Sequence, residues 1–231
     1  MLINTLLSLL RGYHVDLGTV AAQVISILFV ILCILPLHEL AHAWVANKLG
    51  DPTAKLEGRL TFNPLASVDP MGALALLLFG FGWAKPVPVD SRYFRNPKRD
   101  MAITALAGPV SNLLAAFVGA VLVAVMEAFS PYNSFTNFVY NVLWYYVVVN
   151  ISLAVFNLIP MPPLDGSRIV AAFLSDRAMY TYYRYQNLFV MVMFLLLLSG
   201  ALSGPLATAQ TFFANIIFSL ARAPFQLFGL L

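Results

Sequence analysis

The segment LGTVAAQVISILFVILCILPLHELAH, residues 17–42, limits the folds that this chain can adopt. From residue 17 to residue 37 it carries no charged side chain, and crossing a bilayer as a helix takes about 20 apolar residues. Three ionisable residues, His38, Glu39 and His42, follow directly. The segment therefore predicts a first membrane span over residues 17–47 that carries ionisable side chains near its end.

Further uncharged runs predict further spans. One run is broken near its start by Ser130-Pro131-Tyr132-Asn133, and the last run is divided by Ser203-Gly204-Pro205, both of which are turn-forming sequences. The predicted spans after the first cover residues 101–127, 137–159, 185–202 and 205–221. We therefore expect a single-domain, all-α polytopic membrane protein with about five transmembrane helices.

The composition agrees with a membrane protein and excludes several other classes. The chain is 61% hydrophobic and 10% charged, whereas a soluble domain is about 25% charged, so a water-soluble globular protein is not expected. The net charge of +3 is small, and we expect no nucleic-acid partner. The single cysteine, Cys33, excludes an internal disulfide and is interpreted as a packed apolar residue.

The positions of the basic residues predict the orientation in the membrane. They concentrate in two loops, which carry Lys48, Lys55, Arg59, Lys85, Arg92, Arg95, Lys98 and Arg99 in the first and Arg168, Arg177 and Arg184 in the second. Because basic residues mark cytoplasmic loops, five spans would leave the N-terminus outside and the C-terminal end, near Arg222, inside. Residues 1–16 are predicted to form an interfacial segment.

The first loop, residues 50–99, is predicted to contain structure of its own. Charged or polar residues alternate with Leu56, Gly58, Leu60 and Phe62, which is the period of a half-buried strand over residues 55–62. Residues 71–81 are apolar but too few to span, and are expected to be re-entrant or interfacial. Residues 83–90, with two prolines, are typical of an extended sheet edge. The loop thus predicts a small membrane-associated β element.

The HELAH motif, residues 38–42, carries the strongest chemical signal. Residues i and i+4 of a helix share one face, so His38 and His42 can bind one metal ion while Glu39 lies beside it as a general base. The alternative is that these are buried polar residues that serve helix packing. Ionisable groups inside a span are costly, which favours a functional site. His14 lies outside every span and is interpreted as a solvated or interfacial residue.

A catalytic zinc ion has three protein ligands and an open position, so a third ligand must come from elsewhere in the chain. Asp165 is the best candidate, because it follows the third span directly. The ends of the first and third spans lie on the same side of the membrane, so Asp165 and His42 can reach one ion. The alternative is that Asp165 is the N-cap of a helix that begins near Ser167.

Three motifs in this order, HELAH at 38–42, AGPVSN at 107–112 and NLIPMPPLDG at 157–166, resemble the site-2 protease family of intramembrane zinc metalloproteases. The resemblance implies a catalytic core of three transmembrane helices, one Zn²⁺ per chain on His38, His42 and Asp165, and catalysis by Glu39. It also implies that Asn112, Asn157 and Pro163 bind substrate. The alternative for the two asparagines is that their amides only bridge helices. We expect residues 1–231 to contain no counterpart of the regulatory domains that longer relatives carry.

The expected function is therefore zinc-dependent hydrolysis of peptide bonds in membrane-spanning substrates, near the cytoplasmic side of the cell membrane. The expected partners are transmembrane or membrane-associated proteins and the lipid bilayer. Pro36 removes a helix hydrogen bond just before His38 and is expected to open the helix there. The alternatives are a non-catalytic zinc-binding scaffold or transporter, which would not need Glu39, and a membrane-bound peptidase that cuts soluble peptides.

Overall fold

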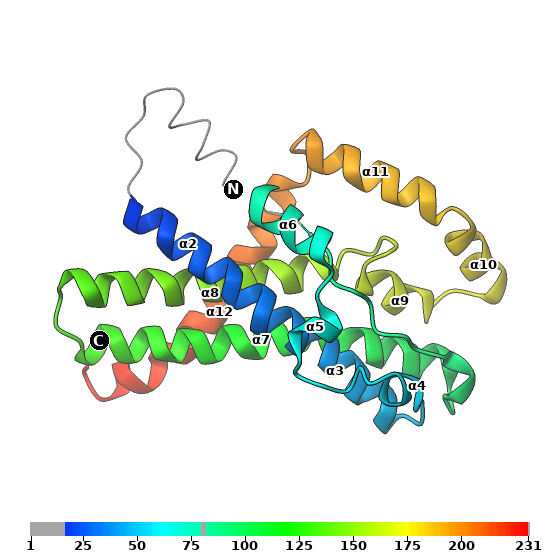
Figure 1. Ribbon diagram of the computed structural model, residues 1–231, viewed down its shortest axis with the longest axis horizontal. Helices are drawn as coiled ribbons and strands as arrows, with labels where there is room; N and C mark the ends of the chain where they lie inside the picture. The colour runs from blue at the N-terminus through cyan, green and yellow to red at the C-terminus, as the bar shows by residue number, and fades with distance from the viewer. Residues whose placement is uncertain (1–16, 80–81, 231) are drawn as a thin grey trace.

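The computed structural model describes residues 17–79 and 82–230, and the predicted interfacial segment 1–16 lies outside these residues. The described chain is a set of helices joined by loops, as predicted (Figure 1). In chain order they are α2 (Leu17–Phe29), η1 (Val30–Ile34), α3 (Leu35–Lys48), α4 (Thr53–Leu56), α5 (Pro64–Ser67), α6 (Pro70–Phe79), η2 (Ser91–Tyr93), α7 (Pro97–Phe129), α8 (Ser134–Asn157), α9 (Asp165–Ala171), α10 (Asp176–Arg184), α11 (Gln186–Leu198) and α12 (Ser203–Leu227).

Helices α2, η1 and α3 follow one another without a break from Leu17 to Lys48. The middle piece, η1, is a π-helix, and Pro36 lies one residue into α3. Proline has no N–H group, and its ring clashes with the carbonyl four residues earlier, which here belongs to Leu32 inside the π-helix. The wider π turn accommodates the ring, so the predicted opening of the helix before His38 is present.

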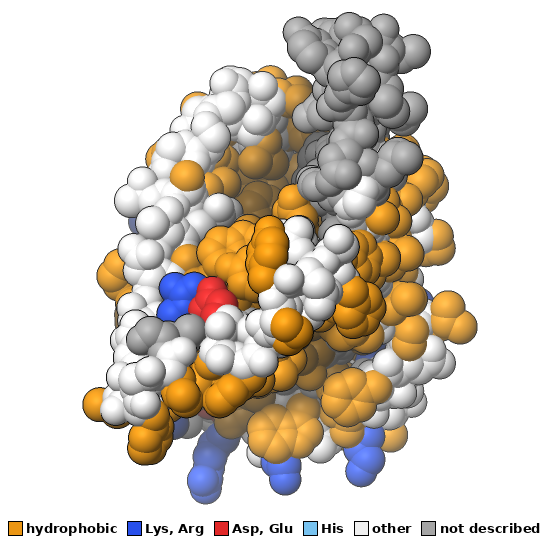
Figure 2. Space-filling view, turned by 90° about the vertical axis from the view of Figure 1, so that its left-hand side faces the viewer, with side chains coloured by type: hydrophobic (Ala, Val, Ile, Leu, Met, Phe, Trp, Pro, Cys, Tyr) orange, Lys and Arg blue, Asp and Glu red, His pale blue; other side chains and the backbone are white. Residues whose placement is uncertain are grey.

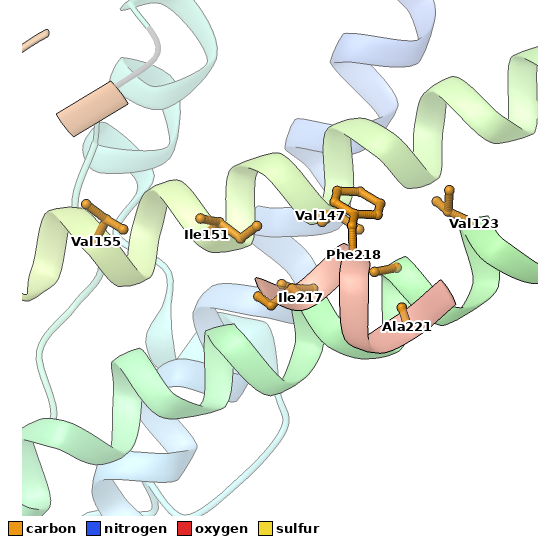
Figure 3. Packing of buried hydrophobic residues seen from close by; sticks show 9 residues of the cluster. Val123, Val147, Ile151, Val155, Ile217, Phe218 and Ala221 are labelled. Carbon is orange, nitrogen blue, oxygen red and sulfur yellow. The ribbon is translucent and has the colours of Figure 1, made fainter. Parts of the chain in front are cut away.

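Helices α7, α8 and α12 pack around the largest apolar core (Figure 3). Helix α7 contributes Val123, α8 contributes Val147 and Ile151, and α12 contributes Ile217 and Phe218, all buried. Small residues on α7 let the helices approach closely, which is the usual way that membrane helices pack. Helix α3 packs against α7 near Gly108, where it carries His38 and His42.

Within residues 17–79 and 82–230, three helical segments are long and apolar enough to cross a membrane: Ile27–Lys48, Pro97–Phe129 and Ser134–Asn157. They correspond to the first three predicted spans. The last two predicted spans form α11 and α12, which meet at a bend of 86° and count together as at most one crossing, so the number of five is not confirmed. Figure 1 shows α11 lying apart from the bundle that α12 joins.

The end of α12 lies opposite to the side that the sequence predicted. The start of α12 lines a pocket with Leu158, just past the end of α8, whereas Arg222 near its other end pairs with Glu127 at the end of α7. Arg222 Nη2 lies 2.6 Å from Glu127 Oε1. In a view of this end of the molecule, an acidic and a basic side chain lie together among hydrophobic ones (Figure 2). The prediction that Arg222 shares a side with the basic loops is therefore wrong.

The strand predicted over residues 55–62 is also wrong. Residues 53–56 form helix α4, and Gly58 ends it in the left-handed conformation with φ +69°. The Arg59 amide donates to Ala54 O and the Gly58 amide to Lys55 O, which is the Schellman pattern of a helix end. The alternation of polar and apolar residues therefore arose from one helical turn and its cap. Within the described residues, no strand of the predicted β element forms.

Residues 83–90, which we call the strap, are extended as predicted. The strap makes a single antiparallel bridge, between Ala84 and Val68, and the Lys85 amide donates to Ser67 O at 2.8 Å. The side chain of Val87 is buried with Ala43 of α3 and Ala54 of α4. The strap is thereby fixed against the last turns of α3, the helix that carries the HELAH motif.

Candidate metal centre

Three sequence-predicted ligands meet at one point. His38 and His42 lie one turn apart on α3, and Asp165 is the first residue of α9. The Nε2 atoms of the two imidazoles are 3.0 Å apart, and Asp165 Oδ2 lies 3.2 Å from His38 Nε2 and 3.3 Å from His42 Nε2. One atom from each residue therefore converges on a shared point, and both histidines are almost fully buried.

The chemistry of these three atoms fits a cation. His42 Nδ1 lies 2.7 Å from the Thr104 carbonyl oxygen, which can only accept, so Nδ1 carries the proton and Nε2 presents a lone pair. That lone pair faces His38 Nε2 and a carboxylate oxygen. Asp165 Oδ2 is buried and has no hydrogen-bond partner within the described part of the chain. Two imidazoles and one carboxylate are a ligand set that zinc enzymes use, and a backbone carbonyl behind a ligand is the usual orienting partner.

The carboxyl group of Asp165 is held in its ionised form. Burial raises its pKa, but when the imidazoles of His38 and His42 carry a proton on Nε2, their hydrogen bonds and positive charge lower the pKa more, so that it lies below its ordinary value. The N-cap of α9 is Leu164, and no side-chain cap is formed there. Asp165 therefore does not act as the N-cap of α9, which was the alternative role.

Two glycines allow the elements of the site to approach each other. A Cβ atom on Gly108 of α7 would lie 2.3 Å from His42 Nε2 and 2.5 Å from His38 Nε2. A Cβ atom on Gly166 would lie 2.3 Å from the Leu158 carbonyl oxygen at the end of α8. Only glycine fits at either position. The AGPVSN and LDG sequences thus bring α7 and the start of α9 directly against the two imidazoles.

Glu39 lies beside the ligand set on α3 and is 8% exposed. Its Oε2 accepts a hydrogen bond of 3.1 Å from the backbone amide of Val87 in the strap. Within the described residues, Oε1 makes no hydrogen bond. One carboxylate oxygen is therefore fixed by the protein and the other is free to interact with a proton.

The three predicted substrate-binding residues lie at different places around the site. Asn112 is on the same face of α7 as Gly108, one turn further on, is fully buried, and leaves both amide atoms without a partner in the described chain. Asn157, at the end of α8, donates to the Leu153 carbonyl oxygen at 3.0 Å. Pro163 is exposed in the loop before α9. The substrate-binding role of these residues stays a prediction.

Sequence reasoning did not find the Thr104 carbonyl or the Val87 amide. Both are backbone groups, and any residue type could supply them, so no residue signal points to them. The function of Gly108 was also missed, although small residues such as glycine in a membrane span allow a close helix approach and could have indicated one here.

Comparison with known proteins shows which family the chain resembles. The family model described as "Peptidase family M50" matches residues 126–200. "Putative zinc metalloprotease YwhC" of Bacillus subtilis is 46% identical over 136 residues, which cover 58% of this chain and 62% of that protein. "Putative zinc metalloprotease Rip2" of Mycobacterium tuberculosis strain H37Rv is 30% identical over 188 residues, which cover 76% of this chain and 68% of that protein. The chain belongs to peptidase family M50.

This is the site-2 protease family that the three motifs indicated, so that resemblance is confirmed. Relatives named as zinc metalloproteases and the set of His38, His42 and Asp165 agree with the expectation of a zinc peptidase and of Zn²⁺ as its metal. The archaeal "Zinc metalloprotease MJ0392" of Methanocaldococcus jannaschii is 30% identical over 157 residues, but these cover only 36% of that protein. The chain also aligns with less than two thirds of the Bacillus protein. No solved structure matches the chain significantly.

Proposed function

We propose that this chain is an intramembrane endopeptidase that cuts membrane-spanning substrates near the cytoplasmic side of the cell membrane. One observation carries the proposal. His38 and His42 are buried on a helix of membrane-spanning length, Asp165 at the start of α9 meets them there, and Glu39 lies next to the three without belonging to the set. A scaffold or transporter that only binds zinc has no use for a carboxylate in that position.

The chain's own residues supply the acid–base chemistry. His38, His42 and Asp165 would hold Zn²⁺, which lowers the pKa of a coordinated water to about 7 and polarises a carbonyl group. Glu39 Oε1 takes a proton from the attacking water and returns it to the amide nitrogen that leaves. Oε2 stays on the Val87 amide at 3.1 Å, so the carboxylate keeps one orientation through both transfers.

Asn112, Asn157 and Pro163 are proposed to hold the substrate. The orphaned amide of Asn112 supports this role, because a buried amide without partners costs free energy until a ligand satisfies it. A peptide backbone offers both the donor and the acceptor that an amide side chain needs. Asn157 and Pro163 flank the loop that leads into Asp165 and would limit how far the peptide extends past the metal.

The substrate is further proposed to bind in an extended form along the strap, because a helix hides its peptide carbonyls from attack. Lys85 and Val87 use their backbone groups on the inner edge, towards Ser67 and Glu39. Alternate residues of an extended chain point to the opposite edge, so Pro86 and Pro88 face outwards and offer carbonyl oxygens but no N–H groups. The outer edge therefore accepts hydrogen bonds from a substrate strand and donates none at these positions.

The proposed orientation rests on the basic loops. Lys98, at the start of α7, pairs with Asp176 of α10 at 2.7 Å, so the two basic loops lie together at the end of the molecule that holds the site. Because basic loops stay in the cytoplasm, the site is proposed to face that side of the plasma membrane. With α12 as the last crossing, its end beside Glu127 would lie outside.

The test uses purified protein in liposomes with a designed single-span reporter peptide that carries a glycine pair at the cytoplasmic end of its helix. We expect cleavage that chelation abolishes and added Zn²⁺ restores. We also expect Glu39→Gln to retain zinc and lose cleavage. If wild type and Glu39→Gln both bind zinc and neither cuts, the scaffold or transporter interpretation replaces this one. Cleavage of soluble peptides in preference to the reporter would favour a membrane-bound peptidase that cuts soluble peptides.

A further inference from the structure

We propose that Asp51 and Arg59 are positioning residues for the proposed peptidase reaction, because they fix the two ends of the strap whose Val87 amide holds Glu39. Neither residue belongs to the metal site, and neither contacts the ligand set. The inference rests on the proposed function for its kinetic consequence, but not for the structural contact itself.

Asp51 is fully buried, and its carboxylate accepts three hydrogen bonds. Oδ1 accepts from the backbone amide and the hydroxyl of Thr53, in its own turn. Oδ2 accepts the Asp90 amide at 2.7 Å, across 39 residues of sequence. A charge-assisted bond of this length is among the stronger hydrogen bonds in proteins. The C-terminal end of the strap is therefore tied to the turn that follows α3.

Arg59 is the corresponding anchor at the other end. It is 6% exposed, and its Nη2 donates to the Lys85 carbonyl oxygen. The Lys85 amide donates at the same place to Ser67 O, so both backbone groups of Lys85 are held. The buried Arg59 guanidinium donates to a strap carbonyl, and its Nε has no hydrogen-bond partner in the described chain. Burying a charged group that is only partly hydrogen-bonded costs free energy. Such a cost indicates that the strap must be held in place.

Between these anchors the strap has little freedom. Pro86 and Pro88 fix their own φ angles near about −65° on both sides of Val87. The Val87 side chain is buried against Ala43, which lies one turn after Glu39 on α3. With both ends tied and the middle stiff, the Val87 amide stays 3.1 Å from Glu39 Oε2. Releasing either end lets the amide move away, and the carboxylate then turns freely.

Asp90 and Thr53 offer matched controls. The Asp90 side chain pairs with Arg92 at the surface, and only its backbone amide reaches Asp51. Asp90→Ala therefore removes a surface ion pair but keeps the anchor. Thr53→Val likewise removes one bond to Asp51 Oδ1 and leaves Oδ2 on the strap. Neither control should alter the position of Val87.

The first measurement is amide hydrogen exchange at Val87, monitored by NMR in the zinc-loaded protein. We expect exchange to be slow in wild type, Asp90→Ala and Thr53→Val, and about tenfold faster or more in Asp51→Asn, Arg59→Lys and Glu39→Ala. Unchanged protection in Asp51→Asn and Arg59→Lys would overturn the proposal. This readout needs no substrate, so it decides the structural claim even if wild type proves inactive.

The second measurement is cleavage of the glycine-pair reporter in liposomes. We expect kcat to fall about 10- to 100-fold in Asp51→Asn and Arg59→Lys, because a misplaced catalytic group costs up to about 100-fold. Zinc content should stay within about twofold of wild type, whereas KM should rise together with the fall in kcat, because the released strap is also the proposed substrate-binding edge. A loss of zinc, a rise in KM with constant kcat, or an unchanged kcat would each contradict a positioning role. Absence of cleavage by wild type would count against the proposed function and not against the anchors.

Discussion

Gly108→Ala should empty the metal centre while leaving the protein folded. The added Cβ would lie 2.3 Å from His42 Nε2, whereas ordinary van der Waals contact begins at 3.4 Å. Helix α7 or the imidazole must therefore move by about 1 Å, since a close-packed interior has no space to absorb the atom. Metal–ligand distances tolerate only about 0.2 Å. Moving the His42 ring also strains its 2.7 Å contact with the Thr104 carbonyl.

Loss of an orienting partner behind a metal ligand typically lowers metal affinity 10- to 100-fold, or by about 1.4–2.7 kcal/mol. We expect at least that loss in zinc affinity, measured by chelator competition and elemental analysis of the purified protein. Gly119→Ala is the matched control, because Gly119 lies on α7 like Gly108 but away from the metal site. Its added Cβ would lie 2.7 Å from the ring of Tyr146 on α8. It should lower the thermal midpoint and keep zinc. Wild-type zinc affinity in Gly108→Ala would refute the reasoning.

Three further predictions concern the bundle and the substrate. In a cysteine-free background, cysteines placed at Asn133 and Gln226 should label from one side of the membrane and a cysteine at Asn96 from the other; labelling of 96 and 226 together would reverse the position of α12. Removing the partly exposed ion pair by Arg222→Ala should lower the thermal midpoint by roughly 2–4 °C, which corresponds to about 1 kcal/mol, and an exchange of Glu127 and Arg222 should recover most of it; an exchanged protein no more stable than Arg222→Ala would contradict the pairing. Helix-breaking residues near a substrate's cut site should speed cleavage, because less helix must be unwound, and equal rates for substrates with and without them would argue against extended binding.

The metal centre could be predicted from the sequence because its geometry is nearly local. Helical spacing alone places His38 and His42 on one face, and the path of the spans brings Asp165 to the same end. Pro36 indicated an irregular helix for a similarly local reason, namely its missing N–H group, and a π-helix precedes it. The helical spacing and the missing N–H group are local properties of the chain, and the position of Asp165 needed in addition only the order of the spans.

The remaining features depend on contacts that the sequence does not encode locally. Alternating residues predicted a strand, but Gly58 adopts a left-handed helix cap, and a glycine in a charged loop is compatible with both. The 86° bend between α11 and α12 falls at residues 199–202, whereas Ser203-Gly204-Pro205, the expected turn, begins α12; no sequence pattern specifies the angle of such a bend. The position of Arg222 depends on Glu127, which lies 95 residues earlier in the chain. Likewise, Asp51 meets the strap only after the chain folds back.

The most direct test of the central claim compares the protein termini in membranes from cells that express wild type or Glu39→Gln at equal levels. The account predicts new N-termini within or next to the cytoplasmic ends of transmembrane segments in wild type. These termini should be absent from the Glu39→Gln membranes, where the uncut proteins accumulate. Identical sets of termini in the two membranes, with equal zinc in both proteins, would contradict the assignment of Glu39 as the base of an intramembrane peptidase.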